Sequence, residues 1–325
     1  MRKKFMSIFL SLAITATTMM GMGATVFAAD ASDTLIFAQA SDPRSLDPAL
    51  ADDGESTKIN TNIYEGLVKY ADDSTEIVPC LAESWDVSDD GLSYTFHLRQ
   101  GVKFHDGTDF NAEAVKINYD RQLPGNATEN MSYAGFIFGS VKDIVVDDDY
   151  TVTINLTEAQ TPFLANLAMV QGSPIVSPKA LEDNNNDVTQ APCGTGPYKF
   201  VRWDVEQDVI LERNEDYWGE PAKTKNVIFK IIKDNSARVI ALNNGEADII
   251  DGVDSNVVDQ ITAAGNIVQQ DEAMMTNYMA FNTTDGAMTS KEARQAVAEA
   301  INVPELVQTL YKGYDEPATT FLPTT

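Results

Sequence analysis

Two stretches of the chain alternate between apolar and polar residues, and this alternation predicts half-buried β-strands. Residues 94–98 read Tyr-Thr-Phe-His-Leu, and residues 151–156 read Thr-Val-Thr-Ile-Asn-Leu. Successive side chains of a strand point to opposite faces, so one face of each segment should be buried. Asp89-Asp90-Gly91 and Asp147-Asp148-Asp149 stand where tight turns would join such strands.

Capping residues, and apolar residues that recur at a longer spacing, indicate helices elsewhere in the chain. Asn111 is placed to cap a helix that runs to about Gln122, and Asp234 or Ser236 to open one that ends near Gly245. The sequence Thr289-Ser-Lys-Glu292 has the spacing of a capping box and precedes a stripe of apolar residues. These helices alternate with strands without the regular rhythm of a Rossmann domain, which still predicts an α/β fold.

The first 28 residues have the pattern of a secretory signal peptide. Arg2, Lys3 and Lys4 precede an apolar stretch, and Val26-Phe27-Ala28 offers small residues to a signal peptidase. We expect cleavage near Ala28/Ala29 and a periplasmic or secreted product. A lipid anchor is not supported because no cysteine lies at this position, and no other apolar run reaches the roughly 18 residues that span a bilayer.

The charge balance excludes one class of partner. The whole chain has a net charge of −26, and removal of the signal would leave about 20 basic residues against 49 acidic ones. Nucleic-acid binding needs clustered lysine and arginine, so we expect no nucleic-acid partner. An acidic excess usually solvates an extracytoplasmic protein; attraction for cationic ligands is the alternative.

Motifs for catalysis or for a bound cofactor are not found. The sequence has no Gly-x-Ser-x-Gly elbow, no His-Glu-x-x-His and no phosphate-binding Gly-x-x-x-x-Gly-Lys loop. His97 lies in a predicted strand and His105 at a predicted turn, where structural or solvated roles are the expectation. No Cys-x-x-Cys or Cys/His cluster predicts a metal site. We therefore expect no enzyme, no cofactor and no metal ligands.

Six motifs together resemble one family. They are Ser45-Leu46-Asp47-Pro48, Tyr64-Glu65-Gly66-Leu67, Leu81-Ala82-Glu83-Ser84-Trp85, residues 96–108 with Asp106-Gly107-Thr108, residues 190–200 with Cys193-Gly194-Thr195-Gly196-Pro197-Tyr198, and residues 211–218 ending in Tyr217-Trp218. In this order and at these spacings, the chain from about residue 33 to its last residue resembles the extracellular solute-binding proteins of dipeptide, oligopeptide and nickel ABC importers.

Two glycines open the most informative of these motifs. Gly194 and Gly196 are predicted to permit a backbone turn that residues with a Cβ resist, and Pro197 fixes φ as the next strand begins. Trp85, Trp203, Tyr217 and Trp218 are interpreted as packing residues.

The resemblance implies an α/β fold of the periplasmic binding protein type II kind, with two lobes and a subdomain inserted in the first. It places lobe I at residues 29–55 and 187–285, and the inserted subdomain at 56–186. Residues 286–325 would begin lobe II, which would be incomplete, so the chain resembles a C-terminally truncated member.

The resemblance also places three candidate binding patches. The first is the loop between Pro48 and Tyr64. The second comes from the inserted subdomain, and the third from the end of lobe I, where a strand end would face the cleft and Asn277 could bond a peptide amide. The candidates are Asp52, Asp53, Gly54, Glu55 and Ser56; Tyr133 and Phe136; and Asp251, Gly252, Val253, Thr276, Asn277 and Tyr278. An acidic surface turn and aromatic core packing are the alternatives for the first two.

Cys80 and Cys193 are the only cysteines, and both follow a proline. An even pair in an exported chain predicts a disulfide, and two buried free thiols are the alternative.

The implied function is binding of peptides in a cleft between lobes and delivery to an ABC permease complex in the membrane, by a monomer. A nickel or metal-chelate ligand is the alternative within the family. A secreted hydrolase with an unrecognised site is the alternative from another class.

Overall fold

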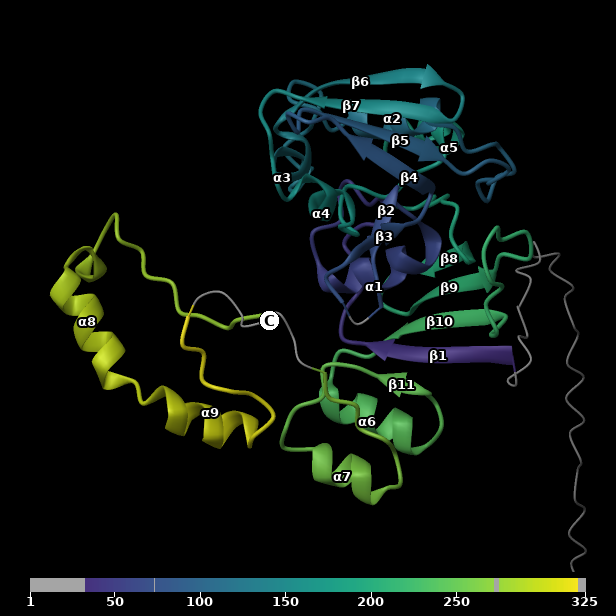
Figure 1. Cartoon of the computed structure of the whole chain (residues 1–325). Coiled ribbons are helices and arrows are strands. Elements are labelled where there is room, and N and C mark those ends of the chain that lie inside the picture. The colour runs from purple at the N-terminus through teal and green to yellow at the C-terminus, as the bar shows by residue number, and fades with distance from the viewer. Residues whose placement is uncertain (1–32, 73, 272–274, 321–325) are drawn as a thin grey trace, which may run out of the picture.

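The structure, a computed structural model, describes residues 33–72, 74–271 and 275–320 (Figure 1). The predicted signal peptide and its cleavage site lie outside the described residues, so they stay predictions.

A five-stranded mixed sheet forms the centre of the described chain (Figure 1). Its order is β11-β1-β10-β9-β8, and β1 is parallel to both β10 and β11 while β10, β9 and β8 are antiparallel. The strands are β1 (Thr34–Gln39), β8 (Tyr198–Asp204), β9 (Asp208–Arg213), β10 (Asn226–Ile231) and β11 (Ile249–Ile250). Since β1 pairs with strands 192 and 212 residues later in the chain, this sheet joins the two ends of a long intervening segment.

Helices flank the sheet, and one of them, α6, begins at a predicted capping residue. Asp234 caps α6 (Asn235–Asn243), as expected, through a bond from the Ala237 amide to its carboxylate of 2.8 Å. Next to it lies α7 (Val258–Ala263), and α1 (Gly54–Ile63) lies over β8. The predicted boundary between residues 55 and 56 therefore falls inside α1.

A second, four-stranded antiparallel sheet has the order β4-β5-β7-β6. Both alternating segments are strands, as predicted, and each of their predicted turns joins two strands. Its strands are β4 (Ala82–Val87), β5 (Ser93–Leu98), β6 (Val141–Asp148) and β7 (Thr151–Leu156). The predicted helix after Asn111 is α2 (Ala112–Asp120), which packs against β6 and β7. The shorter elements around it are β2 (Val68–Tyr70), β3 (Ile77–Pro79), α3 (Ala134–Phe138), α4 (Phe163–Leu167) and α5 (Pro178–Asp183).

The last described elements are η2 (Ala287–Thr289), α8 (Lys291–Ala300) and α9 (Val303–Tyr311), which stand apart from both sheets in Figure 1. The predicted capping box is wrong by one residue. Ser290 is the N-cap of α8, and its hydroxyl accepts a bond from the Ala293 amide at 3.2 Å. Thr289 instead ends the preceding 3₁₀ turn.

Gly194 and Gly196 are required for a different reason from the one predicted. Neither has a positive φ. A Cβ on Gly194 would lie 2.1 Å from the Ile63 carbonyl oxygen, and one on Gly196 would lie 2.7 Å from the Asn62 carbonyl oxygen. The glycines therefore let this segment pass against the end of α1, where the Gly196 amide donates to the Ile63 carbonyl at 2.9 Å.

Glu65 joins three of the sequence motifs. Its carboxylate accepts bonds from the Tyr217 hydroxyl at 2.7 Å, the Trp218 indole at 2.7 Å and the Thr195 hydroxyl at 2.8 Å. Burial raises the pKa of Glu65, and these three bonds oppose that rise. The two aromatic residues therefore act as hydrogen-bond donors as well as packing residues.

A buried ion pair connects the two sheet-bearing regions. Arg121, just after α2, donates to both carboxylate oxygens of Asp47, at 2.7 and 2.9 Å. Asp47 is fully buried and the Arg121 side chain is 9% exposed. Arg121 also donates to the Asn186 carbonyl, at 3.3 Å, so it holds the loop after β1 to the chain segment that returns toward the first sheet.

The predicted disulfide is wrong. Cys80 and Cys193 are both free thiols, and both are buried in the core. Each has its own neighbours. Cys80 lies close to Glu65 and its carbonyl accepts from the Arg99 side chain at 2.6 Å, whereas Cys193 lies beside Asp106. Burial raises the pKa of each thiol to about 12.

We expect neither cysteine of the folded, non-reduced chain to react with Ellman's reagent at pH 8, since both thiols are buried and protonated. After unfolding in guanidinium, two thiols per chain should react. Spectrophotometric thiol counts in both states provide the measurement. If no thiol reacts in the unfolded, non-reduced chain, the two cysteines form a disulfide after all.

Replacing Arg121 by methionine should lower the free energy of unfolding by about 3–5 kcal/mol, because the Asp47 carboxylate would stay buried without its partner. Urea denaturation followed by circular dichroism measures the change. Lys103→Met is the matched control. It removes a 2.6 Å ion pair with Asp109 in which both side chains are more than half exposed, so little change is expected. Equal stability of the Arg121 variant and wild type would contradict a structural role for the pair.

Candidate functional site

The carboxyl ends of three parallel strands meet at one edge of the first sheet. β1 ends at Gln39, β10 at Ile231 and β11 at Ile250, and these strands are neighbours in the order β11-β1-β10. In open α/β sheets, ligands bind outside the carboxyl ends of such strands. Two of the three predicted patches adjoin this edge: the loop that follows β1 and the turn that follows β11. We call it the carboxyl edge.

The loop after β1 is fixed by the start of α1. Asp53 is the N-cap, and its carboxylate accepts from the amide and the hydroxyl of Ser56, at 2.9 and 2.5 Å. The Ser56 hydroxyl oxygen in turn accepts from the amides of Arg44 and Ser45, at 2.8 and 3.2 Å. Ser56 is fully buried, so its side chain supports the loop instead of lining a site.

The other loop candidates remain open to solvent to different degrees. Asp52 forms an ion pair with Arg44 at 3.0 Å, in which the arginine side chain is 71% exposed. Gly54 opens α1, and a Cβ built there would meet no atom within 4 Å. The first turn of α1 is therefore uncovered at Gly54.

Lys58 connects α1 with the turn after β11. Its ammonium donates to Asp251 and lies 2.6 Å from Glu55 Oε2, and all three side chains are between one-fifth and one-third exposed. It also lies 5.7 Å from the centre of the Phe37 ring on β1. Burial lowers the pKa of Lys58, but the bond to Asp251 and the charge of Glu55 outweigh this, so the net shift is upward. The ammonium therefore stays charged.

The turn after β11 is held by Arg238 of α6. This buried guanidinium donates to the Ile232 carbonyl at 2.8 Å, just after β10, and to the Gly252 carbonyl at 3.4 Å. Gly252 has φ of +60°, which favours glycine, and Val253 is half-buried. Asp251 thus projects from a turn that is tied to two strand ends.

The aromatic patch lies close to the loop after β1. Met131 and Ala134 form one small apolar cluster with Ala49, with Leu50 packed against it. Beside them, Tyr133 is partly buried against the main core, and Phe136 on α3 is 60% exposed. The structure therefore leaves Phe136 available for contact and gives Tyr133 mainly a packing role.

The last three candidates do not extend a strand. Thr276, Asn277 and Tyr278 lie in a segment with neither helix nor strand; Thr276 is half-buried, while Asn277 and Tyr278 are exposed. In Figure 1 this part of the chain leads from the first sheet toward α8. The predicted strand end at Asn277 is therefore wrong, whereas the one before Asp251 is confirmed.

Sequence reasoning missed Lys58 and Arg238. The spacing Glu55-x-x-Lys58 on a capped helix does predict an ion pair between neighbouring turns. Its second partner, Asp251, is 193 residues away, and no local pattern indicates that contact.

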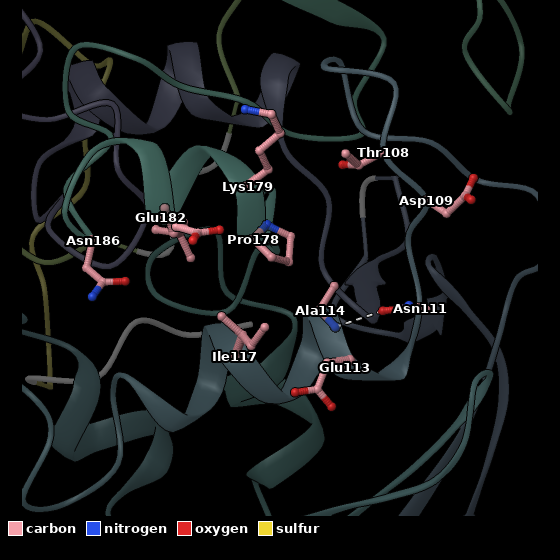
Figure 2. A pocket seen from close by; sticks show the side chains of 11 residues that line it. Thr108, Asp109, Asn111, Glu113, Ala114, Ile117, Pro178, Lys179, Glu182 and Asn186 are labelled. Atoms are coloured by element: carbon pink, nitrogen blue, oxygen red, sulfur yellow. Dashed lines mark hydrogen bonds between the residues drawn. The ribbon is translucent and has the colours of Figure 1, made fainter.

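A separate groove of about 570 Å³ lies between α2 and α5 (Figure 2). Several of its polar groups are already engaged. Asn111 Oδ1 accepts from the Ala114 amide at 3.0 Å, and Lys179 forms an ion pair with Asp183. None of the candidate residues lines this groove, and it is not at the carboxyl edge.

Both histidines have structural partners. His97 lies 3.0 Å from Asp86 on the neighbouring strand. Burial lowers the pKa of His105 to about 4, so the ring is neutral; it donates to the Gly196 carbonyl at 2.9 Å and accepts from the Gly194 amide at 3.4 Å. Neither ring is thus presented as a catalytic base.

Residues 76–325 match the sequence family described as "Bacterial extracellular solute-binding proteins, family 5 Middle". The chain belongs to this family. It is 34% identical over 285 residues to the glutathione-binding protein GsiB of Pectobacterium atrosepticum, an alignment that covers 86% of this chain and 54% of the relative. The chain therefore spans little more than half the length of the curated relatives it matches.

Solved structures of family 5 proteins have the same fold. DppA from Helicobacter pylori, in complex with peptide STSA, superposes with a TM-score of 0.83 at 36% identity and covers 89% of this chain and 60% of its own. NikA from Brucella suis, in complex with Fe(III)-EDTA, superposes with a TM-score of 0.78 at 30% identity over 89% and 58% of the two chains. The α/β, periplasmic binding protein type II architecture is thereby confirmed.

The described residues contain no helix long and apolar enough to cross a membrane. The same part of the chain contains no group of three or more histidine, cysteine, aspartate or glutamate residues that could hold a metal ion.

Replacing Asp53 by alanine should destabilise the protein by about 1 kcal/mol, because α1 loses its N-cap and Ser56 loses its acceptor. Hydrogen exchange should quicken at the amides of the first turn of α1. Asp52→Ala, beside it, removes only a part-exposed ion pair and should leave that exchange unchanged. Equal effects of the two substitutions would contradict the capping role of Asp53.

Proposed function

We propose that this chain is the ligand-binding component of an ABC importer. It binds a peptide at the carboxyl edge, as one wall of an interlobe cleft, and delivers it to a membrane permease from the periplasm. The observation that supports the proposal is that the Asp52–Glu55 loop and the Asp251 turn, which are linked through Lys58, both adjoin that edge in a family 5 fold. Within the proposal the protein acts as a monomer and catalyses no reaction.

Peptides suit this edge better than metal chelates. An extended peptide is held largely by main-chain hydrogen bonds, which demand few side chains, and the relative in complex with peptide STSA superposes with a TM-score of 0.83. Relatives in complex with Fe(III)-EDTA or Ni(L-His) keep a chelate as the alternative ligand.

The test is isothermal titration of the full chain with a pool of di- to pentapeptides and, separately, with Ni²⁺ and L-histidine. We expect saturable binding of peptides. Chromatography of the peptides after incubation should show no cleavage. Binding of the nickel mixture alone would favour the chelate alternative, and cleavage of the peptides would favour a hydrolase.

Gly54→Trp should abolish that binding, because the new side chain would fill the open space over the first turn of α1. Glu113→Trp, which fills the groove of Figure 2 instead, is the matched control and should bind as wild type does. Loss of binding in the Glu113 variant alone would move the site to that groove and overturn the proposal.

A further inference from the structure

His105 lies in a tight turn that reaches from the second sheet toward the first. The turn follows β5, and within it the Phe104 amide donates to the Thr108 carbonyl and the Gly107 amide to the Phe104 carbonyl, each at 2.9 Å. It contacts residues 193–196, which come just before β8 of the first sheet and are all buried. His105 is thus placed where two regions of the chain meet.

Three hydrogen bonds hold this contact, and two of them use the imidazole ring. The His105 amide donates to the Gly194 carbonyl at 2.9 Å. In the ring, Nε2 is 2.9 Å from the Gly196 carbonyl oxygen, and Nδ1 is 3.4 Å from the Gly194 amide nitrogen. A carbonyl oxygen only accepts and an amide N–H only donates, so both bonds form only when the ring is neutral with its proton on Nε2. We call these three bonds the His105 clamp.

A second proton on the ring is incompatible with the clamp. It would bind Nδ1, which faces the Gly194 amide, so a donor would then stand opposite a donor. The segment has little room to adjust, because Gly194 and Gly196 lie directly against the end of α1 and the Gly196 amide donates to the Ile63 carbonyl at 2.9 Å. A charged ring therefore requires the segment to move away from it.

Burial is the main reason that the ring stays neutral. Lys199 on β8 also opposes a positive charge there, whereas Asp106 favours one, and the pKa of the ring is lowered to about 4. The Cys193 thiol beside the clamp is protonated and carries no charge. Glu65 contacts the same segment through its bond from Thr195. Because burial raises the pKa of Glu65, acid does not favour release at that contact.

We propose that the His105 clamp is an acid-sensitive link between the two sheets: protonation of the ring releases residues 193–196 and loosens the region of the second sheet from that of the first. The buried pair of Asp47 and Arg121 contains no histidine and keeps the two regions connected. Phe136 belongs to the region of the second sheet and the carboxyl edge to the first sheet, so release would loosen two of the candidate patches relative to each other. The inference does not depend on which ligand binds.

The difference in proton affinity between the two states gives the direction and the pH window. The ring has a pKa of about 4 in the closed clamp and the ordinary value of about 6.5 once the segment is released. The clamp is therefore fully stable above about pH 6.5 and weakens as the pH falls toward 4. For one group with these two values, the released population should grow roughly 25-fold between about pH 7.5 and about pH 5.0.

Cys193 reports on release, because its thiol is buried next to Gly194, whereas Cys80 lies outside the clamp. The full chain is labelled with dithiodipyridine, which reacts with thiols in mild acid, at several values from about pH 7.5 to about pH 5.0. Each rate is divided by that of a free cysteine peptide at the same pH, and peptide mass spectrometry assigns the labelled residue. The normalised rate at Cys193 should rise roughly 25-fold, and that at Cys80 should stay low.

The two histidines of the chain provide a variant and its matched control. His105→Gln keeps a donor and an acceptor but takes up no proton in this range, so its Cys193 labelling should not rise in acid, whatever its absolute rate. His97→Gln changes the other histidine, whose side chain is 45% exposed on β5, and should keep the rise. Melting temperatures at neutral pH check that both variants fold.

Three results would overturn the inference. A flat Cys193 rate in the wild-type chain would do so, and that measurement needs no variant. An undiminished rise in the His105 variant would show that another group takes up the proton. Equal labelling of Cys80 and Cys193 in acid would show unfolding of the whole chain instead of release at the clamp. An NMR titration of the wild-type rings adds a direct check, since His105 should titrate near pH 4, and a midpoint near 6.5 would contradict the closed clamp.

Discussion

The position of the candidate site depends on one buried ion pair, between Asp47 and Arg121. A carboxylate without solvent must be compensated, and both of its oxygens accept from one guanidinium at 2.7 and 2.9 Å. The bidentate geometry also fixes direction, because it holds the loop after β1 against the end of α2 and the chain segment at Asn186. The same loop continues within a few residues to Asp53, so the ion pair also fixes the position of the start of α1.

A second buried carboxylate, that of Glu65, is compensated in the same way just after the carboxyl end of α1. Its buried carboxylate collects three donors from segments that lie 130 to 153 residues further along the chain. Gly194 and Gly196 make this possible, since any side chain there would overlap the end of α1. Motifs that are far apart in the sequence therefore supply the two partners of the same contact. They specify the scaffold rather than the ligand.

Local patterns predicted the local structure well and the long-range contacts poorly. Strands at residues 94–98 and 151–156 and the caps Asn111 and Asp234 depend only on neighbouring residues, and all four are confirmed. The disulfide failed because pairing depends on distance in the fold, which cysteine spacing does not report. The partnership of Lys58 with Asp251 could not be predicted either, because it exists only after β1 and β11 pair. The resemblance supplied the location of the candidate patches but not their chemistry.

Hydrogen bonding differs between the two scaffold carboxylates, at Asp47 and Glu65, and the Gln39 amide at the carboxyl edge. The carboxylates of Asp47 and Glu65 are fully engaged with donors, and a satisfied buried group favours a single rigid arrangement. At the carboxyl edge, Gln39 Oε1 is a buried acceptor without a hydrogen bond from the described residues, while Glu55 Oε2 lies 2.6 Å from the Lys58 ammonium. A buried acceptor that stays unpaired costs about 1–3 kcal/mol. Donors from the chain thus fix the loops that carry Asp47 and Glu65, whereas the buried acceptor of Gln39 has no donor among the described residues.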